Sequence, residues 1–384
     1  MADAPGPLAG VRIVELAGIG PGPLAAMMLA DLGATVIRVD RKVPSGLGAP
    51  RPPRFDLALR NRGSIRVDLK DPAAVALVLE LVADADALIE GFRPGVTERL
   101  GLGPDVCLAR NPRLVYGRVT GWGQSGPLAQ AAGHDVNYIA LTGLLDAVGR
   151  AGQPPTIPLN LVGDYAGGAL MLAFGLLAGI LEARQSGRGQ VVDAAMVDGV
   201  TTLMTVLYGL RWAGMHNGPR GTNLLDSGTP WYEVYPCADG LHVAVGAIEE
   251  KFYLQMLQLL DLDTPLMRRR EDRAEWPAIR QALAERFRSR TRDDWVAVFA
   301  DTDVCCSPVL TMEEAPAHPH LRSRASFVDV DGVMHPAPAP RFSRTPAARP
   351  SAPAAPSADG ARAALANWLP VDRVDDLLAT GTVA

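Results

Sequence analysis

Cysteine is scarce in this 384-residue chain, and its scarcity disfavours several kinds of site. The 4 cysteines form no C-x-x-C pair, so neither a zinc knuckle nor a dithiol redox motif is expected. Cys305 and Cys306 are adjacent and do not easily bridge to each other, so we expect reduced thiols in a reducing compartment. No charge of one sign dominates either. The 37 basic and 42 acidic residues leave a net charge of −5, which disfavours nucleic acid as a partner.

Long apolar runs and targeting segments are missing as well. The most apolar run covers residues 167–181, shorter than the roughly 18–20 residues that a membrane span needs, and it predicts a buried core helix. Residues 1–7 have no cationic n-region and no apolar core, so they do not resemble a signal peptide. Residues 381–384 carry no peroxisomal or retention tag. We therefore expect a cytoplasmic protein with no membrane partner.

What the chain does have is an ordinary globular composition, 48% hydrophobic and 21% charged, and a regular alternation of segments in its first half. Asp71 followed by Pro72 is typical of an N-cap and a first helical position. Strands are expected at residues 11–16, 35–40, 87–92, 114–120 and 191–193, and helices at 24–32, 72–83, 135–145, 164–183 and 196–215. Strands that alternate with helices predict a largely parallel, doubly wound sheet.

The pattern changes in the second half of the chain. Two strand-like segments, 231–235 and 241–247, are joined by a hairpin turn signal at residues 238–240. Helices are expected at 251–260, 276–288 and 293–300, the last of them opened by a capping box of Thr291 and Asp294. Residues 336–358 are rich in proline and alanine and lack periodicity, which predicts an extended tail that wraps the surface.

These segments predict an α/β fold with a large, doubly wound, Rossmann-like domain and a smaller α+β domain. A chain of this length normally forms more than one domain, because single domains usually have about 100–200 residues. The expected boundaries are residues 1–195 together with 335–384 for the large domain, 196–227 for a linking helical region, 228–325 for the small domain and 326–334 for a return linker.

Three short motifs suggest other functions, and each is incomplete. Residues 18–23 lie between a strand and a helix, with Asp40 ending the next strand as in a dinucleotide fold, but Pro23 stands where G-x-G-x-x-G requires its third glycine. A tight turn that lets the helix pack on the sheet is the better interpretation. Residues 123–126 lack the G-x-S-x-G pattern of a serine hydrolase, and the segment 318–320, His-Pro-His, lacks partner residues for a metal.

Two titratable residues follow glycines at predicted helix starts: His134 follows Gly133, and Asp164 follows Gly163. Helix N-termini offer free N–H groups and partial positive charge, which suit a developing anion. Asp164 is explained as well by an ordinary N-cap, and His134 by a structural histidine. From these residues alone, both interpretations stay open.

A series of blocks along the chain resembles the α-methylacyl-CoA racemase branch of the family III CoA-transferases. They cover most of the chain up to about residue 345, and their number and order make the resemblance specific. The blocks are Val14-Glu15-Leu16-x-Gly18 with Pro21-Gly22-Pro23, Arg38-Val39-Asp40-Arg41, Asp68-Leu69-Lys70, Arg93-Pro94-Gly95-Val96, Gly121-x-Gly123-Gln124-x-Gly126, Gly133-His134-Asp135-x-Asn137-Tyr138, Asn160-Leu161-x-Gly163-Asp164-x-x-Gly167-Gly168, Gly189-Gln190-x-x-Asp193, Asn223-x-x-Asp226, Gly246-Ala247-Ile248-Glu249 and Pro340-Arg341-Phe342-Ser343.

This resemblance implies an acyl-CoA substrate and a place in lipid and fatty acid metabolism. It makes His134 and Asp164 the two acid–base groups, and Glu249 the residue that hydrogen-bonds the histidine. It also implies an interlocked homodimer, in which each active site lies between the large domain of one subunit and the small domain of the other. The implied coenzyme A-binding residues are Arg41, Val67, Asp68, Leu69, Lys70, Gly91, Phe92, Arg93, Arg99, Gly133 and Tyr138.

The implied reaction moves a proton at the α-carbon of the thioester. One of His134 and Asp164 removes the proton, and the other reprotonates the planar enolate on the opposite face. Backbone N–H groups near Asp135 would hold the enolate oxygen. No metal or redox cofactor is required. The alternatives are a CoA-transferase, in which Asp164 is a nucleophile that forms covalent intermediates, and a catalytically silent protein that binds CoA.

Overall fold

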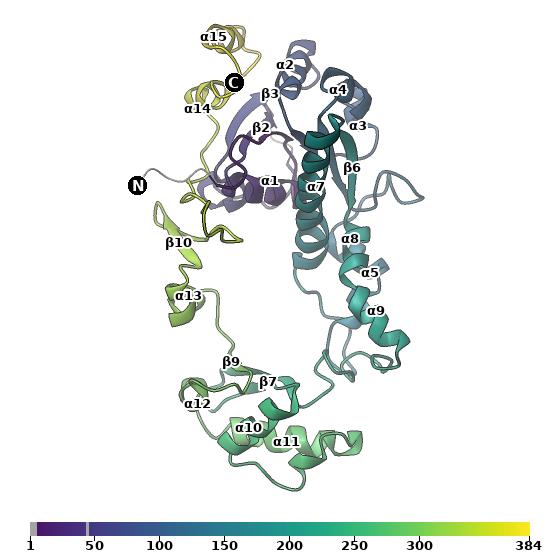
Figure 1. The fold of residues 1–384 in the computed structure, drawn as a ribbon, viewed down its shortest axis with the longest axis vertical. Helices are drawn as coiled ribbons and strands as arrows, with labels where there is room; N and C mark the ends of the chain where they lie inside the picture. The colour runs from purple at the N-terminus through teal and green to yellow at the C-terminus, as the bar shows by residue number, and fades with distance from the viewer. Residues whose placement is uncertain (1–5, 44–45) are drawn as a thin grey trace. The chain divides into compact units, whose positions relative to one another are not determined.

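A computed structural model of the chain describes residues 6–43 and 46–384 (Figure 1). Residues 1–5, part of the N-terminal segment that does not resemble a signal peptide, and residues 44–45 lie outside the described residues. The chain forms two compact units. The large unit comprises Met1–Thr142, Leu159–Leu203 and Ser323–Ala384, and the small unit comprises Gly143–Pro158 and Met204–Arg322.

The large unit is built on a six-stranded parallel sheet, which confirms the predicted doubly wound α/β fold. The strand order is β3-β2-β1-β4-β5-β6. This order reverses between β1 and β4, and open α/β sheets bind ligands outside the carboxyl ends of their strands at such a point. The strands are β1 (Arg12–Leu16), β2 (Thr35–Arg41), β3 (Gly63–Val67), β4 (Ala87–Glu90), β5 (Val115–Thr120) and β6 (Gln190–Ala195).

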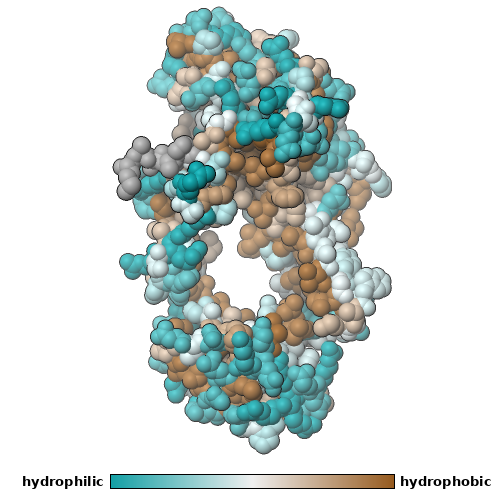
Figure 2. Space-filling view, in the orientation of Figure 1, coloured by the Kyte–Doolittle hydropathy of each residue, from teal (hydrophilic) through white to brown (hydrophobic). Residues whose placement is uncertain are grey.

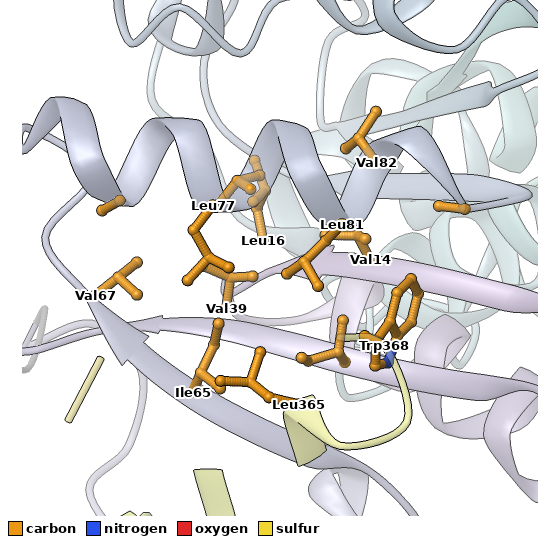
Figure 3. Close-up of a cluster of buried hydrophobic side chains, with 14 of the residues drawn as sticks. Val14, Leu16, Val39, Ile65, Val67, Leu77, Leu81, Val82, Leu365 and Trp368 are labelled. Atoms are coloured by element: carbon orange, nitrogen blue, oxygen red, sulfur yellow. The ribbon is translucent and has the colours of Figure 1, made fainter. Parts of the chain in front are cut away.

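Helices cover both faces of this sheet, so its central strands bury apolar side chains on both sides. Val14 and Leu16 of β1 belong to one core, which Figure 3 shows with Leu77 and other residues of α2 (Pro72–Ala83). Ile13 belongs to the other core, together with residues of α1 (Pro21–Asp31) and α7 (Met171–Ser186). Alternate side chains of β1 therefore point to opposite faces of the sheet and pack against helices on each face.

The remaining elements of the large unit are short. One hairpin, formed by β10 (Phe327–Val330) and β11 (Val333–Pro336), lies in the returning part of the chain. The others are η1 (Pro53–Phe55), η2 (Leu57–Leu59), α3 (Val96–Arg99), α4 (Pro104–Arg110), α5 (Asp135–Leu141), the π-helix η3 (Leu161–Leu170), α8 (Met196–Leu203), α14 (Ala358–Leu365) and α15 (Val371–Ala379).

The sequence does not predict β3, α14 or α15. Gly63, Ser64 and Arg66 interrupt the apolar alternation of β3, so only Ile65 and Val67 are buried in this short strand. α14 packs against β3 and lies directly after the extended segment at residues 337–357. The edge strand and the late helix stabilise each other, and neither has a strong local signal of its own.

Among the described residues, one helical stretch, Leu161–Ser186, is long and apolar enough to cross a membrane. Of its most apolar 18 residues, 50% are buried inside the protein. Its α7 portion packs against β5 and β6, with Leu172, Leu176 and Ile180 in the core. Such burial is typical of a core helix in a soluble protein, as the sequence predicts for residues 167–181. The π-helical start of this stretch, η3, is not predicted.

The small unit contains a three-stranded antiparallel sheet in the order β7-β8-β9, and its first two strands form the predicted hairpin. The predicted capping box is confirmed: Thr291 Oγ1 accepts a hydrogen bond from the Asp294 N–H at 3.1 Å. The elements are β7 (Tyr232–Pro236), β8 (His242–Gly246), β9 (Cys306–Pro308), α6 (Leu144–Ala147), α9 (Thr205–Trp212), α10 (Glu250–Leu259), α11 (Trp276–Phe287), α12 (Arg292–Phe299), α13 (Pro319–Ser323), η4 (Met267–Arg269), η5 (Arg273–Glu275) and η6 (Ala315–Ala317).

Truncation of the α14 side chain that enters the core tests whether this late helix is part of the large unit. Leu365 is fully buried at 0% exposure, so Leu365→Ala should lower the free energy of unfolding by about 2–5 kcal/mol through lost burial and a cavity. Val371→Ala, at a residue that is 68% exposed, should change it by less than about 0.5 kcal/mol. Urea unfolding followed by tryptophan fluorescence measures both. Equal, small losses would show that α14 does not stabilise the sheet.

Candidate active site

The predicted coenzyme A-binding residues gather at one edge of the large unit's sheet. Arg41 ends β2, residues 67–70 end and follow β3, and residues 91–93 follow β4. The carboxyl ends of parallel strands share one edge, so the fold brings these three groups together where ligands bind in such sheets. Arg99 ends α3, a little further along the chain.

A hydrogen bond to a buried carboxylate joins the two segments that carry His134 and Asp164. The backbone N–H of Asp164 donates to Oδ2 of Asp135 at 2.8 Å, and Asp135 is only 4% exposed. His134 is the exposed N-cap of α5, whereas Asp164 is half-buried in the first turn of η3. An imidazole and a carboxylate therefore stand at the starts of two segments that contact each other directly.

Close packing at this contact requires a glycine. A Cβ atom on Gly163 would lie 2.6 Å from Oδ2 of Asp135, so a larger residue would displace the carboxylate from the Asp164 N–H. On the other side of the contact, Oδ1 of Asn137 accepts a hydrogen bond from the backbone N–H of His134 at 3.0 Å. This is the reach-back bond of a capping box. It holds the main chain of His134 and leaves the imidazole exposed.

The carboxyl of Asp164 has a mixed environment. Burial raises its pKa and the negative charge of Asp135 adds to the rise, whereas a hydrogen bond from Asn160 and the charge of His134 oppose it. The bond from Asn160 Nδ2 to Oδ2 of Asp164 is 3.1 Å long. The same oxygen faces the turn before α1, since a Cβ atom on Gly20 would lie 3.6 Å from it. A carboxyl with a raised pKa exchanges its proton more readily near neutral pH.

The backbone of Asp164 is held by packing on several sides. It lies in the π-helix η3, a rare form that is frequent at functional sites. Segment η3 packs against α1, α5 and α8. A Cβ atom on Gly199 of α8 would lie only 1.9 Å from the carbonyl oxygen of Gly167, so the backbones of α8 and η3 are in contact there. These neighbours leave η3 little freedom to move Asp164.

Tyr138 supports the loop before His134 from the inside. It is 6% exposed and its hydroxyl donates to the carbonyl oxygen of Gly133. Trp122 packs edge-on against the Tyr138 ring, with 4.8 Å between the ring centroids. Burial raises the pKa of Tyr138 to about 12, so the hydroxyl keeps its proton at neutral pH. Tyr138 of α5 thus holds Gly133 in place, and both are predicted CoA-binding residues.

Glu249, the third predicted catalytic side chain, belongs to the small unit. It is the exposed N-cap of α10. Its hydrogen bond to His134 would join residues of different units and stays a prediction. A cavity of about 250 Å³ lies elsewhere, at the amino ends of β4 and β5, where Asp86 and Arg113 are among the residues that line it. That cavity is remote from the carboxyl edge of the sheet and is not the candidate active site.

Comparison with known proteins identifies the family. Residues 8–361 match the family model described as CoA-transferase family III. The chain belongs to CoA-transferase family III. This confirms the family resemblance that the order of the sequence blocks predicts. The match covers parts of both units.

Two curated relatives of this chain carry the name alpha-methylacyl-CoA racemase. The Mus musculus protein is 44% identical over 351 residues, which are 91% of this chain and 90% of that protein. The Homo sapiens protein is 42% identical over 343 residues, 88% of this chain and 87% of that protein. A more distant relative, succinyl-CoA–D-citramalate CoA-transferase from Chloroflexus aurantiacus, is 32% identical over 363 residues, 89% of each chain.

Solved structures of the same fold are also similar over nearly the whole chain. A CaiB/BaiF family protein from Brucella suis superposes with a TM-score of 0.81 and 25% identity, covering 95% of this chain and 100% of that one. A Mycobacterium tuberculosis protein in an orthorhombic crystal form superposes with a TM-score of 0.78 and 26% identity, covering 96% of this chain and 100% of that one.

Sequence reasoning missed three neighbours of the site. Asn160 lies four residues before Asp164, a spacing at which helical side chains contact each other, so it could have been predicted as a partner of the carboxyl. The sequence predicts only a tight turn at Gly20, and the contact of this residue with Asp164 has no local signal. Trp122 lies against Tyr138 through the fold alone.

Removal of the Asn160 amide tests its influence on the candidate base. Asn160→Ala should raise the pKa of Asp164 further, because the variant loses the donor that favours the charged carboxylate. The measurement is an NMR titration of aspartate carboxyl carbons labelled with ¹³C. Asn367→Ala, at an exposed asparagine of the same unit, is the matched control and should leave the titration unchanged. An Asp164 pKa in Asn160→Ala at or below that of the wild type would contradict the assignment.

Proposed function

We propose that the chain is an isomerase that interconverts the (R)- and (S)-epimers of 2-methylacyl-CoA thioesters by proton transfer at carbon 2. The single observation that carries this proposal is the bond between the Asp164 N–H and Asp135, which brings the segments of His134 and Asp164 together. The name of the two curated relatives, alpha-methylacyl-CoA racemase, supports the same reaction.

The proposed reaction follows from the acidity of the thioester's α-carbon. One of the two groups, His134 or Asp164, removes the proton as the carbanion charge spreads onto the thioester oxygen as an enolate. The other group then returns a proton to the opposite face of the planar carbon, which inverts it. The backbone N–H groups at the start of α5, near Asp135, stabilise the negative oxygen. Each inversion leaves the two groups with exchanged protonation states.

The environment of Asp164 suits this exchange. An ordinary aspartate is a weak base near neutral pH, whereas burial raises the pKa of Asp164 and brings it closer to that of an imidazole. A raised pKa lets the carboxyl act as an acid as well as a base, which a reversible epimerisation needs. Glu249 would orient the imidazole of His134, as the third member of a catalytic triad does.

The cationic residues at the sheet's carboxyl edge would bind the phosphates of coenzyme A. Arg41, Lys70, Arg93 and Arg99 are exposed there, and guanidinium groups pair with phosphate through two parallel hydrogen bonds. The reaction needs no metal and no redox cofactor, because the thioester itself supplies the acidity. All four cysteines are free, in keeping with a reducing, cytoplasmic location.

A CoA-transferase is the second candidate, and a relative at 32% identity carries such a name. In that reaction the carboxylate of Asp164 would attack the thioester and form a covalent intermediate. The higher identity to the two relatives named alpha-methylacyl-CoA racemase, 44% and 42%, favours the isomerase. The two functions differ in one observable property: only the isomerase exchanges the α-hydrogen without an acyl acceptor.

Alanine substitutions of the two acid–base residues test the proposal. His134→Ala and Asp164→Ala should each slow exchange of the α-hydrogen by about 10²–10⁴-fold, because each variant loses one positioned proton-transfer group. One epimer of a 2-methylacyl-CoA is incubated in deuterated water. Deuterium at carbon 2 is followed by mass spectrometry, and the epimer ratio by chiral chromatography.

Exposed residues of the same types serve as controls. The variants His320→Ala and Asp359→Ala should exchange the α-hydrogen of the substrate at the wild-type rate. Exchange within a few-fold of wild type in either active-site variant would refute the acid–base assignment. A hydroxylamine-trapped adduct on Asp164 in wild-type protein, together with no exchange, would establish the CoA-transferase instead.

We also infer a homodimer, because one face of the η3–α7 helix is apolar and exposed. Leu170, Phe174, Leu177 and Leu181 recur at helical spacing, and Phe174 is 72% exposed. Figure 2 shows hydrophobic residues gathered over the region of α7. Apolar surface of this extent on a helix is typical of an interface with another chain.

A charge placed on this face tests the dimer. Phe174→Glu should weaken association at least tenfold, because a carboxylate in an apolar interface loses its hydration without a partner. Sedimentation velocity over a concentration series measures the dissociation constant. Val371→Glu, at another exposed apolar residue of the large unit, should associate like the wild type. A wild-type protein that stays monomeric at micromolar concentration would refute the dimer.

A further inference from the structure

Two buried ion-pair networks lie near the carboxyl edge of the large unit's sheet and take no part in the proton transfer proposed above. One joins Glu15 of β1 to Arg38 of β2, with side chains that are 1% and 10% exposed. The other joins Glu90 of β4 to Arg118 of β5, with side chains that are 0% and 7% exposed. Buried ion pairs contribute little net stability, because the cost of desolvation offsets most of the attraction. Stability alone therefore does not explain why these two networks are present.

The Glu90 network ends on the backbone of the predicted CoA-binding loop at residues 91–93. Oε1 of Glu90 accepts a hydrogen bond from Nε of Arg118 at 2.6 Å. Its other oxygen, Oε2, accepts from the backbone N–H of Phe92 at 2.7 Å. Arg118 is held in turn by Glu98, through Nη1 and Oε1 at 2.8 Å. Glu90 thus fixes the direction in which the chain leaves β4.

The Glu15 network reaches the backbone of Arg41 less directly, through Asp40, because the second oxygen of Glu15 accepts from Arg62. Arg38 donates from Nη1 to Oε1 of Glu15 at 3.0 Å and from Nε to Oδ2 of Asp40 at 3.2 Å. The second oxygen of Asp40, Oδ1, accepts from the backbone N–H of Arg41 at 2.8 Å. Asp40 thus stands between a buried guanidinium and the main chain at the end of β2.

The two residues on which these networks end contact each other. The guanidinium carbon of Arg41 lies 5.7 Å from the centroid of the Phe92 ring, within the range of a cation–π interaction. An aromatic ring and a planar guanidinium are both surfaces on which a flat nucleobase stacks. The main chain of Phe92 is held by the buried carboxylate of Glu90, and that of Arg41 by the partly exposed carboxylate of Asp40.

We propose that Glu90 and Asp40 are positioning residues that act through Phe92 and Arg41 to preset the surface on which the adenine base of coenzyme A stacks. The inference deepens the function proposed above and rests on it. A surface that is fixed before binding loses less conformational entropy when the ligand arrives, which strengthens binding. Glu90 and Asp40 therefore set the affinity for the nucleotide half of the substrate and leave the proton-transfer step unchanged.

The experiment compares ligands with and without the nucleotide. Glu90→Gln and Asp40→Asn should each weaken binding of adenosine 3′,5′-bisphosphate, measured by calorimetry, by roughly 3- to 10-fold, the effect of losing about one hydrogen bond. The KM for a 2-methylacyl-CoA should rise by the same factor with kcat unchanged. For the corresponding 2-methylacyl-pantetheine, which has no adenine, kcat/KM should stay at the wild-type value.

Matched variants separate positioning from a loss of structure. Glu80→Gln removes a carboxylate that pairs with Arg373 on α15, and it should leave all these constants unchanged. In a Phe92→Leu background, which already lacks the ring, Glu90→Gln should have no further effect on nucleotide binding. If Glu90→Gln fails to fold, Asp40→Asn, at a side chain that is 33% exposed, decides the question.

Three outcomes would overturn the inference. They are unchanged nucleotide binding in the foldable variants, an equal loss with acyl-pantetheine, and additive effects of Phe92→Leu and Glu90→Gln. A different result would show that the proposed isomerase activity is wrong. In that case wild-type protein shows no exchange of the α-hydrogen, while the calorimetric comparison of nucleotide binding still reports on Glu90 and Asp40.

Discussion

The hydrogen bond between the Asp164 N–H and the buried carboxylate of Asp135 is the contact on which the candidate active site depends. A backbone N–H that donates to an ionised group forms one of the stronger hydrogen bonds in proteins. This one brings the starts of α5 and η3 together, and the negative charge of Asp135 contributes to the raised pKa of Asp164. Because Gly163 leaves room for no side chain there, geometry and basicity at the site depend on the same close approach.

The carboxyl edge of the sheet would combine the proposed proton transfer with the proposed binding of coenzyme A. Parallel strands end together, so loops that are distant in the sequence present Arg41, Phe92 and Gly20 at one edge. Near that edge, the buried carboxylate of Glu90 pairs with Arg118 through one oxygen and accepts from the backbone N–H of Phe92 through the other. Part of the costly burial of charge therefore lies where a loop leaves the carboxyl end of a strand.

Much of the fold could be predicted from local signals. The alternation of strands and helices, the N-cap at Asp71 and the capping box at Thr291 all depend on residues a few positions apart, and each is confirmed. The prediction failed for β3, α14 and the π-helix η3. A five-residue edge strand with two buried side chains has little signal of its own, and it forms because α14 covers it from the far end of the chain.

By itself, the sequence determined the doubly wound architecture, the family, and the placement of His134 and Asp164 after glycines at the starts of helical segments. These features follow from periodicity, capping and the order of motifs, which are properties of neighbouring residues. Only the tertiary structure decided which groups surround Asp164, because Asp135 and Gly20 come to its carboxyl through packing between segments. Burial and charge set a pKa, and both are properties of the folded neighbourhood rather than of the chain.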